Sequence, residues 1–427
     1  MDYLQFREEY PTFIYEEFAW EIRNDQLHTQ FSYRTPPDHA FVHRVIFESM
    51  GASAPNRAID NLVFHIGLVE MPSYWKATCS PRVEVRAGQI SPKQAHWWRR
   101  LFIGGMGEYF YKNDIDFTQD GFLDITSYGN RAVGEFAEFN NTGAVLVPIG
   151  GGKDSAVSAE ILRQNYPIQC LLINPTPAAR SVASLAGCEA PIIVRRTIDP
   201  YLLQLNQQGF LNGHIPFSAS IAFISLLVAA LGQHKYMAIS NERSSNEGNV
   251  HYLGHEINHQ YSKSLEFETD FNRYVHAFIT RDITYFSFLR PLYELQIAKL
   301  FSKMPQYFPV FRSCNQAQKS NSWCGHCPKC LSIALTLMPW TDRATIEGIF
   351  GFDPLVDPDN QEVLRQMKGE RENKPFECVT TFEEAQIAQE MLESGMTARV
   401  QSFLERWLDN PNMPEEFSRI LRQAYVA

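Results

Sequence analysis

The chain has 427 residues, a formal net charge of −10 and a pI near 5.7. This acidic balance argues against non-specific binding to nucleic acid or to anionic membranes. The hydrophobic content of 44% is typical of a soluble globular protein, and the length predicts about two or three domains. The first nine residues are acidic and lack an apolar core, so we expect no signal peptide and a cytoplasmic protein.

Residues 1–140 are expected to form an α+β domain. The segments 13–22 and 26–33 are partly alternating in polarity and flank Arg-Asn-Asp, which predicts a β-hairpin. Further on, Ser91 and Pro92 are typical of an N-cap and a first helical position, and the helix should run towards residue 110.

That helix carries His-Trp-Trp-Arg-Arg at residues 96–100. Two tryptophans beside two arginines could stack a base and hold a phosphate. The same pattern is typical of a helix with one tryptophan in the core and arginines along its exposed face. We favour the second interpretation.

The most informative stretch begins at residue 144. An apolar run at 144–149 predicts a buried strand, and Ala156 to Leu162 predicts a helix. Between them stand Gly150, Gly151, Gly152, Lys153, Asp154 and Ser155. Glycines let backbone N–H groups approach an anion, and the start of a helix adds a positive partial charge. The stretch therefore predicts an anion site.

Two common phosphate loops do not fit this stretch. A kinase-type P-loop requires glycine at position 147 and serine or threonine at position 154, where the chain has Val147 and Asp154. The dinucleotide fingerprint requires a third glycine at position 155, where the chain has Ser155. The remaining pattern, Gly-Gly-Lys-Asp-Ser after a strand, resembles the PP-loop of the ATP-pyrophosphatase (adenine nucleotide alpha hydrolase) superfamily. That resemblance implies cleavage of ATP to AMP and pyrophosphate. Gly150 stands where this superfamily often has serine.

Residues 141–340 alternate between strand and helix patterns, which predicts an α/β fold with a doubly wound parallel sheet. Ligands in such sheets lie beyond the carboxyl ends of the strands. We therefore expect the glycine loop, Asn174, and the segment of Ser240, Asn241, Glu242 and Arg243 to lie on one edge. The expected strands are 144–149, 169–173, 192–195 and 236–239, and the expected buried helix is 218–232.

The polar stretch 240–249 follows a predicted strand and is expected to be a loop on that edge. Arg243 can form a bidentate pair with a phosphate or a carboxylate. Glu242 or Glu247 could hold Mg²⁺ beside phosphates. A solvated loop without function is the alternative, and its position makes us favour function.

Two sets of histidines lie near this loop in the sequence. His214 comes just before the predicted buried helix and could act as an acid or base, or simply stand at the helix entry. His251, His255 and His259 have the spacing of one helical face. Gly254 and the absence of a nearby carboxylate triad weaken a zinc interpretation of this row, so we treat these histidines as candidate substrate contacts.

Cys314, Cys324, Cys327 and Cys330 are separated by nine, two and two residues. Four thiolates close a tetrahedral shell, so this spacing predicts a structural zinc site. An iron–sulfur cluster is the alternative, but the next cysteine and proline of the ferredoxin pattern are missing. With one tight cluster and four scattered cysteines, a disulfide scaffold is not expected.

Residues 341–427 are expected to form a helical segment without chemistry of its own. The patterns at 381–394 and 397–409 predict two helices, the first opened by a threonine N-cap with two glutamates in its first turn.

Taken as a whole, the chain resembles the ATP-dependent epimerases that invert the terminal glutamate of UDP-N-acetylmuramoyl-L-alanyl-L-glutamate in peptidoglycan synthesis. The resemblance rests on the glycine loop, on the polar loop at 240–249, on the cysteine cluster, and on the order of the predicted parts. It implies ATP and Mg²⁺ as cofactors and a small-molecule substrate, with no nucleic acid and no membrane as partners.

The resemblance also implies roles for individual residues. Gly150 to Gly152 and Ser155 would hold pyrophosphate, Lys153 would offset its charge, Asp154 would help to place Mg²⁺, and Arg243 would hold a substrate carboxylate or phosphate. His214, Glu242 and Glu247 are candidates for the base. Asn174, Ser240 and Asn241 are expected to contact the nucleotide.

Two other functions remain open at this point. One is a PP-loop ligase or thiolase that adenylates a nucleobase, a tRNA or another carboxylate substrate. The other is a zinc-stabilised nucleotide sensor without turnover.

Overall fold

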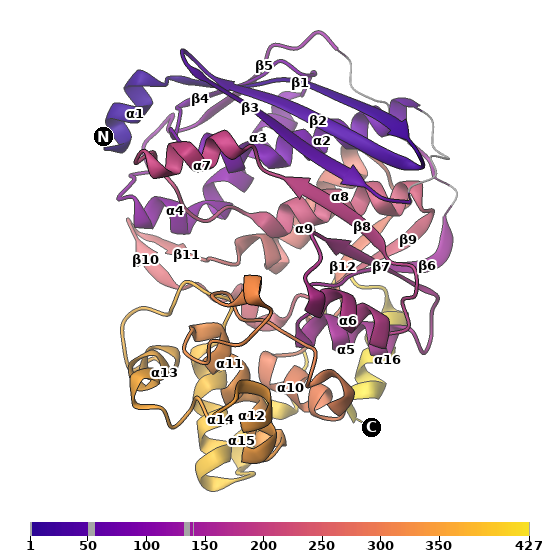
Figure 1. Cartoon of the computed structure of the whole chain (residues 1–427), viewed down its shortest axis with the longest axis vertical. Helices are drawn as coiled ribbons and strands as arrows, with labels where there is room; N and C mark the ends of the chain where they lie inside the picture. The colour runs from indigo at the N-terminus through magenta and orange to yellow at the C-terminus, as the bar shows by residue number, and fades with distance from the viewer. Residues whose placement is uncertain (1, 50–55, 132–136, 140, 427) are drawn as a thin grey trace. The chain divides into compact units, whose positions relative to one another are not determined.

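The computed structural model describes residues 2–49, 56–131, 137–139 and 141–426 (Figure 1). The chain divides into two compact units that are not consecutive segments. Unit 1 comprises residues 1–142, 192–235 and 251–284, and unit 2 comprises residues 143–191, 236–250 and 285–427. The sequence had suggested linear domains with boundaries near 140 and 340. The chain instead passes several times between the two units.

Unit 1 is built on a mixed sheet with strand order β8-β3-β2-β1-β4-β5. β1 pairs antiparallel with β2, β2 with β3, and β3 with β8, whereas β1–β4 and β4–β5 are parallel. The bounds of these strands are Thr12–Arg23 for β1, Gln26–Thr35 for β2, His39–Phe47 for β3, Arg82–Val85 for β4, Asp124–Ser127 for β5 and Ile192–Thr197 for β8.

The predicted β-hairpin is confirmed by the pairing of β1 with β2. Asn24 and Asp25 form its two-residue turn with φ of 50° and 62°. Positive φ at both turn positions matches the right-handed twist of the flanking strands, and asparagine and aspartate tolerate this conformation best after glycine.

Helices cover the sheet of unit 1. They are α1 (Tyr3–Glu9), α2 (Asn56–Trp75), α3 (Pro92–Gly105), α4 (Gly107–Lys112), α7 (Pro200–Gln207), α8 (Phe217–Leu231) and α9 (Leu265–Phe278). α2 packs against α8 and against β1 and β2. Ser91 caps α3 as predicted, and Pro92 is its first residue. The helix ends at Gly105, before the predicted end near residue 110.

The tryptophan pair of α3 belongs to the core of unit 1. Trp98 is fully buried, and its indole N–H donates to the Tyr274 hydroxyl at 3.0 Å. Trp97 packs against Trp98 and lies 4.4 Å from the Tyr274 ring, centroid to centroid. The favoured core interpretation of this motif is therefore confirmed for Trp98.

Unit 2 is an α/β unit with strand order β12-β9-β6-β7, in which β6 and β7 are parallel. Its strands are β6 (Thr142–Pro148), β7 (Ile168–Ile173), β9 (His234–Ile239) and β12 (Thr284–Ser287). α5 (Lys153–Leu162) and α6 (Pro177–Leu185) alternate with these strands, and α10 (Glu294–Ser302) follows β12. The strand and helix predicted around the glycine loop are thus confirmed.

The strand predicted at 192–195 is confirmed. Residues 192–197 do form a strand, β8, but this strand belongs to unit 1 and pairs antiparallel with β3. A short apolar strand pattern indicates burial and does not specify the pairing partner, so the antiparallel pairing with β3 was not predicted.

The C-terminal helices are part of unit 2. They are α11 (Pro328–Leu337), α12 (Arg343–Phe350), α13 (Gln361–Met367), α14 (Phe382–Ser394), α15 (Ala398–Leu404) and α16 (Glu415–Val426). Thr381 caps α14 in a capping box with Glu384, as predicted. α15 ends before the predicted end near 409, and α16 was not predicted. Within the described part of the chain, every helix is too short or too polar to cross a membrane.

Two mid-helix glycines provide a test of this packing. A Cβ added at Gly67 in α2 would lie 1.9 Å from the Tyr15 hydroxyl, whereas one added at Gly348 in α12 would meet nothing within 4 Å. We expect Gly67→Ala to destabilise the protein by about 1–3 kcal/mol through overpacking. Gly348→Ala should stabilise it by about 0.4–1 kcal/mol. Thermal unfolding measures both, and a shift of the same sign in the two variants would contradict the packing described.

Candidate active site

The glycine loop of unit 2 has the geometry of an anion site. Gly151 has φ of +92°, and a Cβ there would lie 2.7 Å from the backbone nitrogen of Ala179, so only glycine fits. Gly152 is the N-cap residue of α5 and has no side chain to cap the helix. The first N–H groups of α5 therefore remain available to an anion. The Ser155 hydroxyl donates to the Gly152 carbonyl at 3.0 Å.

Three carboxylates and two lysines lie at this loop. One carboxylate oxygen from each of Asp154, Glu242 and Glu294 lies within 4.8 Å of the others. The Lys153 ammonium donates to both Asp154 and Glu294. The Lys329 ammonium lies 3.4 Å from the other oxygen of Glu294. The group thus brings together residues from α5, α10, α11 and the loop after β9.

Glu294 and its two lysines hold one another charged. Burial by itself raises the pKa of Glu294, but Lys153 and Lys329 outweigh it and hold that pKa well below its usual value. Burial lowers the pKa of Lys329, yet Glu294 and Asp154 outweigh it, so the pKa of Lys329 lies above its usual range. Opposite charges within a few ångströms favour the ionised form of each partner.

Local structure explains where Glu242 and Glu294 stand. Glu294 is the first residue of α10, and its N–H donates to the Ser244 hydroxyl at 3.2 Å. The backbone carbonyl of Glu242 accepts from the buried Arg290 guanidinium at 2.6 Å. Hydrogen bonds of the polar loop therefore fix the backbone of both glutamates.

The polar loop is not a solvated loop. Asn241, Glu242, Ser244 and Ser245 are buried, whereas the sequence allowed for an exposed segment. The Asn241 amide donates to the Ser287 hydroxyl at 3.2 Å. Among the described residues, the buried Ser240 hydroxyl contacts no hydrogen-bonding group. Because buried hydroxyls are nearly always hydrogen-bonded, a ligand atom is a candidate partner for this one.

Other predicted site residues occupy different surroundings. The Arg243 guanidinium lies 5.0 Å from the centre of the Tyr293 ring, in a cation–π contact. Glu247 pairs with the buried Lys374 ammonium at 3.0 Å and accepts the N–H of Phe382. Asn174 is exposed after β7, with φ of 44°. Of the two candidates for Mg²⁺, Glu242 therefore lies in the carboxylate group, and Glu247 is engaged by Lys374.

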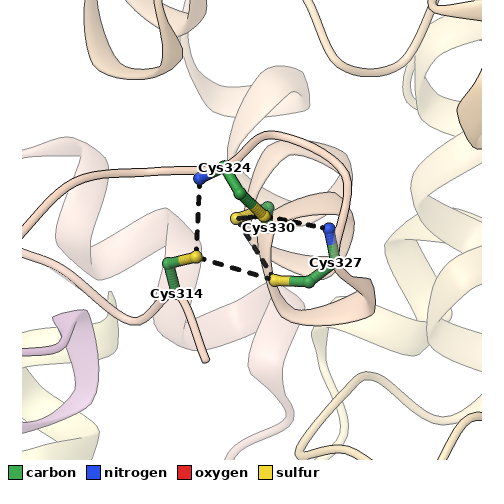
Figure 2. Close-up of side chains that lie close together, drawn as sticks. All are labelled: Cys314, Cys324, Cys327 and Cys330. Carbon is green, nitrogen blue, oxygen red and sulfur yellow. Dashed lines mark hydrogen bonds between the residues drawn. The ribbon is translucent and has the colours of Figure 1, made fainter. Parts of the chain in front are cut away.

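The four cysteines come together as the spacing predicted (Figure 2). The sulfur–sulfur distances are 3.9 Å for Cys314–Cys327, 3.8 Å for Cys324–Cys330 and 3.4 Å for Cys327–Cys330. Tetrahedral zinc with bonds of about 2.3 Å places its sulfur ligands about 3.8 Å apart. The four cysteines therefore fit such an ion.

Backbone N–H groups surround these sulfurs. Cys314 accepts from the N–H groups of Ala317 and Cys324, at 3.2 and 3.4 Å. Cys324 accepts from those of His326 and Cys327, at 3.4 and 3.3 Å. Such donors stabilise thiolates, which is the form that binds metal.

Unit 2 also contains a disulfide between Cys170 and Cys188, a single bond rather than a scaffold.

Two of the predicted histidines meet in unit 1. His259 pairs with the buried carboxylate of Glu108, and His214 Nδ1 lies 3.9 Å from the same carboxylate. The two imidazole rings are 4.1 Å apart, centre to centre. Partial burial and the neighbouring His259 lower the pKa of His214 to about 3, and Glu108 acts in the opposite direction. His214 is therefore neutral at pH 7.

His251, His255 and His259 do not lie on one helix. His251 lies in β10 (Val250–Tyr252) and His255 in β11 (His255–Ile257), which pair with each other. Leu253 and Gly254 make the turn between them, with φ of 51° and 80°. Positive φ at two consecutive residues ends any helix, so the i, i+4, i+8 spacing has no helical face here.

Sequence reasoning missed Glu294, Lys329 and Glu108. Each acts on its partners across more than 30 residues of chain, with Glu294 standing 141 residues after Lys153. For Lys329, the position between two cluster cysteines was a signal that could have been used.

Residues 5–288 match the MurL N-terminal domain, and residues 310–419 match the MurL C-terminal domain. This chain belongs to the MurL family. No solved structure matches this MurL-family chain.

Curated relatives extend over most of the chain. A UDP-N-acetyl-alpha-D-muramoyl-L-alanyl-L-glutamate epimerase from a Micromonospora species is 37% identical over 348 residues, which cover 79% of this chain and 74% of the relative. Proteins of the same name from Salinispora tropica and Xanthomonas oryzae pv. oryzae are each 31% identical. The matches cover 89% and 84% of this chain, and 84% and 80% of those relatives.

The cysteine cluster generates a prediction. We expect the purified protein to carry about one zinc ion per chain, and Cys330→Ser to lose it and to melt at a lower temperature, because metal affinity and folding are coupled. Elemental analysis measures the metal. Cys378→Ser, outside the cluster, is the matched control and should retain the ion. Iron with sulfide in the wild type, or full zinc in Cys330→Ser, would contradict the assignment.

Proposed function

We propose that this chain is an ATP-dependent epimerase that converts the terminal L-glutamate of UDP-N-acetylmuramoyl-L-alanyl-L-glutamate to D-glutamate, in the synthesis of peptidoglycan precursors. The names of the curated relatives support the substrate and the reaction. The group of Lys153, Asp154, Glu242 and Glu294 at the glycine loop is the observation that supports the use of ATP. The proposal includes membership of the PP-loop superfamily.

The chemistry explains why ATP would be needed. Removing the α-proton next to a free carboxylate places a second negative charge on an anionic group. In the proposed reaction, a carboxylate oxygen of the terminal glutamate attacks the α-phosphorus of ATP. The bond from that phosphorus to the bridging oxygen breaks, and pyrophosphate leaves with the electron pair. The acyl-adenylate has lost the carboxylate charge, and its carbonyl can accept electrons.

Epimerisation then needs two proton transfers. A base takes the α-proton, and the electron pair moves into the carbonyl to give an enolate. A proton returns to the opposite face of the α-carbon. Water then hydrolyses the acyl–phosphate bond and releases AMP and the D-glutamyl product. Backbone N–H donors near the carbonyl oxygen would lower the cost of the enolate.

The residues of unit 2 receive the following roles. Gly150, Gly151, Gly152 and Ser155 hold the β- and γ-phosphates by the N–H groups at the start of α5. Lys153 offsets their charge. Asp154, Glu242 and Glu294 are the oxygen ligands available to Mg²⁺, which would neutralise phosphate charge and orient the α-phosphorus. Ser240 and Asn241 contact the nucleotide from the end of β9, Asn174 contacts it from the end of β7, and Arg243 holds a substrate carboxylate or phosphate.

His214 is our candidate for the base. It is neutral at pH 7, so that its imidazole can accept a proton, and the Glu108 carboxylate 3.9 Å away favours the imidazolium that forms. Glu242 is less suited to this role because it belongs to the carboxylate group at the glycine loop. Glu247 is engaged by Lys374.

The overall reaction can be tested with ATP, Mg²⁺ and the muramoyl dipeptide in heavy water. We expect AMP and pyrophosphate in equal amounts and one deuterium at the glutamate α-carbon. Mass spectrometry and chiral analysis of released glutamate measure the outcome. ADP in place of AMP would exclude the proposal. AMP without α-deuterium would favour a PP-loop ligase.

A second test separates adenylation from proton transfer. His214→Asn should reduce α-deuterium incorporation by about 100-fold or more, the typical contribution of a general base, while ATP–pyrophosphate exchange persists. His28→Asn, in strand β2 of the same unit, is the matched control and should leave both rates unchanged. If His214→Asn abolishes both activities equally, or neither, His214 is not the base.

A further inference from the structure

Lys329 joins the cysteine cluster to the carboxylate group. It stands between Cys327 and Cys330, where Cys327 is the N-cap residue of α11 and Pro328 its first residue. Its backbone N–H donates to the Glu377 carboxylate at 2.9 Å. Two adjacent cluster cysteines and one carboxylate thus fix the backbone of this lysine, whose side chain is nearly 90% buried.

The side chain of Lys329 leads away from the cysteines to Glu294. Its ammonium lies 3.4 Å from Glu294 Oε1, while Glu294 Oε2 contacts the Lys153 ammonium. One carboxylate therefore holds two buried lysines, one from the glycine loop and one from the cysteine turn. A buried ammonium is costly unless it is paired, and Lys153 alone already neutralises Glu294.

The charge of the group indicates what the second lysine is for. The three carboxylates and the two lysines leave one net negative charge, and one divalent cation at the carboxylates turns this into one net positive charge. A triphosphate with its metal still brings negative charge into the site. Without Lys329 the same group would be neutral with its metal and would attract the triphosphate less strongly.

We propose that Lys329 is a second phosphate-binding residue of the candidate active site, which the cysteine turn positions to neutralise the departing pyrophosphate. This inference rests on the proposed function. In the protein without nucleotide, Glu294 holds both ammonium groups. When the polyphosphate binds, its oxygens replace Glu294 as the partner of Lys329. The cysteine cluster then has a role in activity beyond folding, because it fixes the backbone position from which the Lys329 side chain extends.

The test compares Lys329→Met and Lys329→Arg in the full chain, with inorganic pyrophosphate and Mg²⁺ as the probe. Calorimetry should give roughly 10- to 100-fold weaker pyrophosphate binding for Lys329→Met, the value of one charged hydrogen bond, and partial recovery for Lys329→Arg. Zinc content should stay at the wild-type value in both. Turnover should show a lower kcat with a smaller change in the KM for the dipeptide.

Lys374→Met is the matched control. Lys374 is also buried in unit 2 and also pairs with one glutamate, Glu247. The Lys374→Met variant should bind pyrophosphate like the wild type, even if its melting temperature is lower. Equal losses in the two methionine variants would overturn the inference, and so would wild-type affinity in Lys329→Met or no pyrophosphate binding by the wild type. A wild type that binds pyrophosphate but forms no AMP overturns only the proposed function.

Discussion

The arrangement of the candidate active site depends on the carboxylate of Glu294. This side chain is about 1% exposed and lies between two buried lysines that come from 141 residues before it and 35 residues after it. Removing one partner from a buried ion pair leaves an uncompensated charge, which typically costs about 3–5 kcal/mol. The same ion pairs that neutralise Glu294 therefore hold the glycine loop, α10 and the cysteine turn in a fixed arrangement.

Residues near the cysteine cluster also help to hold the glycine loop in place. The N–H of Arg312, two residues before Cys314, donates to the Gly151 carbonyl at 2.9 Å. The Asn321 side chain accepts the N–H of Ala178, next to the residue that approaches Gly151. The chain around Cys314 thus contacts the glycine loop through Arg312, and the start of α6 beside that loop through Asn321. A cluster that looks purely structural by its spacing is connected to the site through backbone hydrogen bonds and through Lys329.

Features set by local sequence were predictable. The glycine loop with β6 and α5, the turn at Asn24 and Asp25, and the caps at Ser91 and Thr381 all depend on residues within about four positions of one another. The cysteine cluster was predictable for a different reason, because metal ligands leave a fixed spacing in the chain. In each of these features, the residue types and the geometry are linked by short-range sterics or by coordination chemistry.

Features set by long-range contacts were not predictable. The sequence of β8 predicts a buried strand, but it does not predict the antiparallel pairing with β3 or the place of β8 in unit 1. The burial of the polar loop at 240–249 could not be predicted, because its partners, such as Arg290 and Glu384, lie far along the chain. Glu294 follows a tyrosine at the start of an ordinary helix, and nothing in its neighbourhood marks it. Buried polar groups are paired, but a sequence does not name the partner.

The two units carry different kinds of chemistry, and this bears on how an epimerase of this type would work. Unit 2 gathers carboxylates, lysines and uncapped N–H groups, which suit phosphates and a divalent cation. Unit 1 gathers a neutral histidine, a second histidine and a buried glutamate, which suit proton transfer. In the proposed reaction, adenylation lowers the charge next to the α-carbon before the base acts, so that a neutral imidazole could take the α-proton. His214 is neutral at pH 7, and the Glu108 carboxylate 3.9 Å from its Nδ1 favours the imidazolium that would form when it accepts this proton.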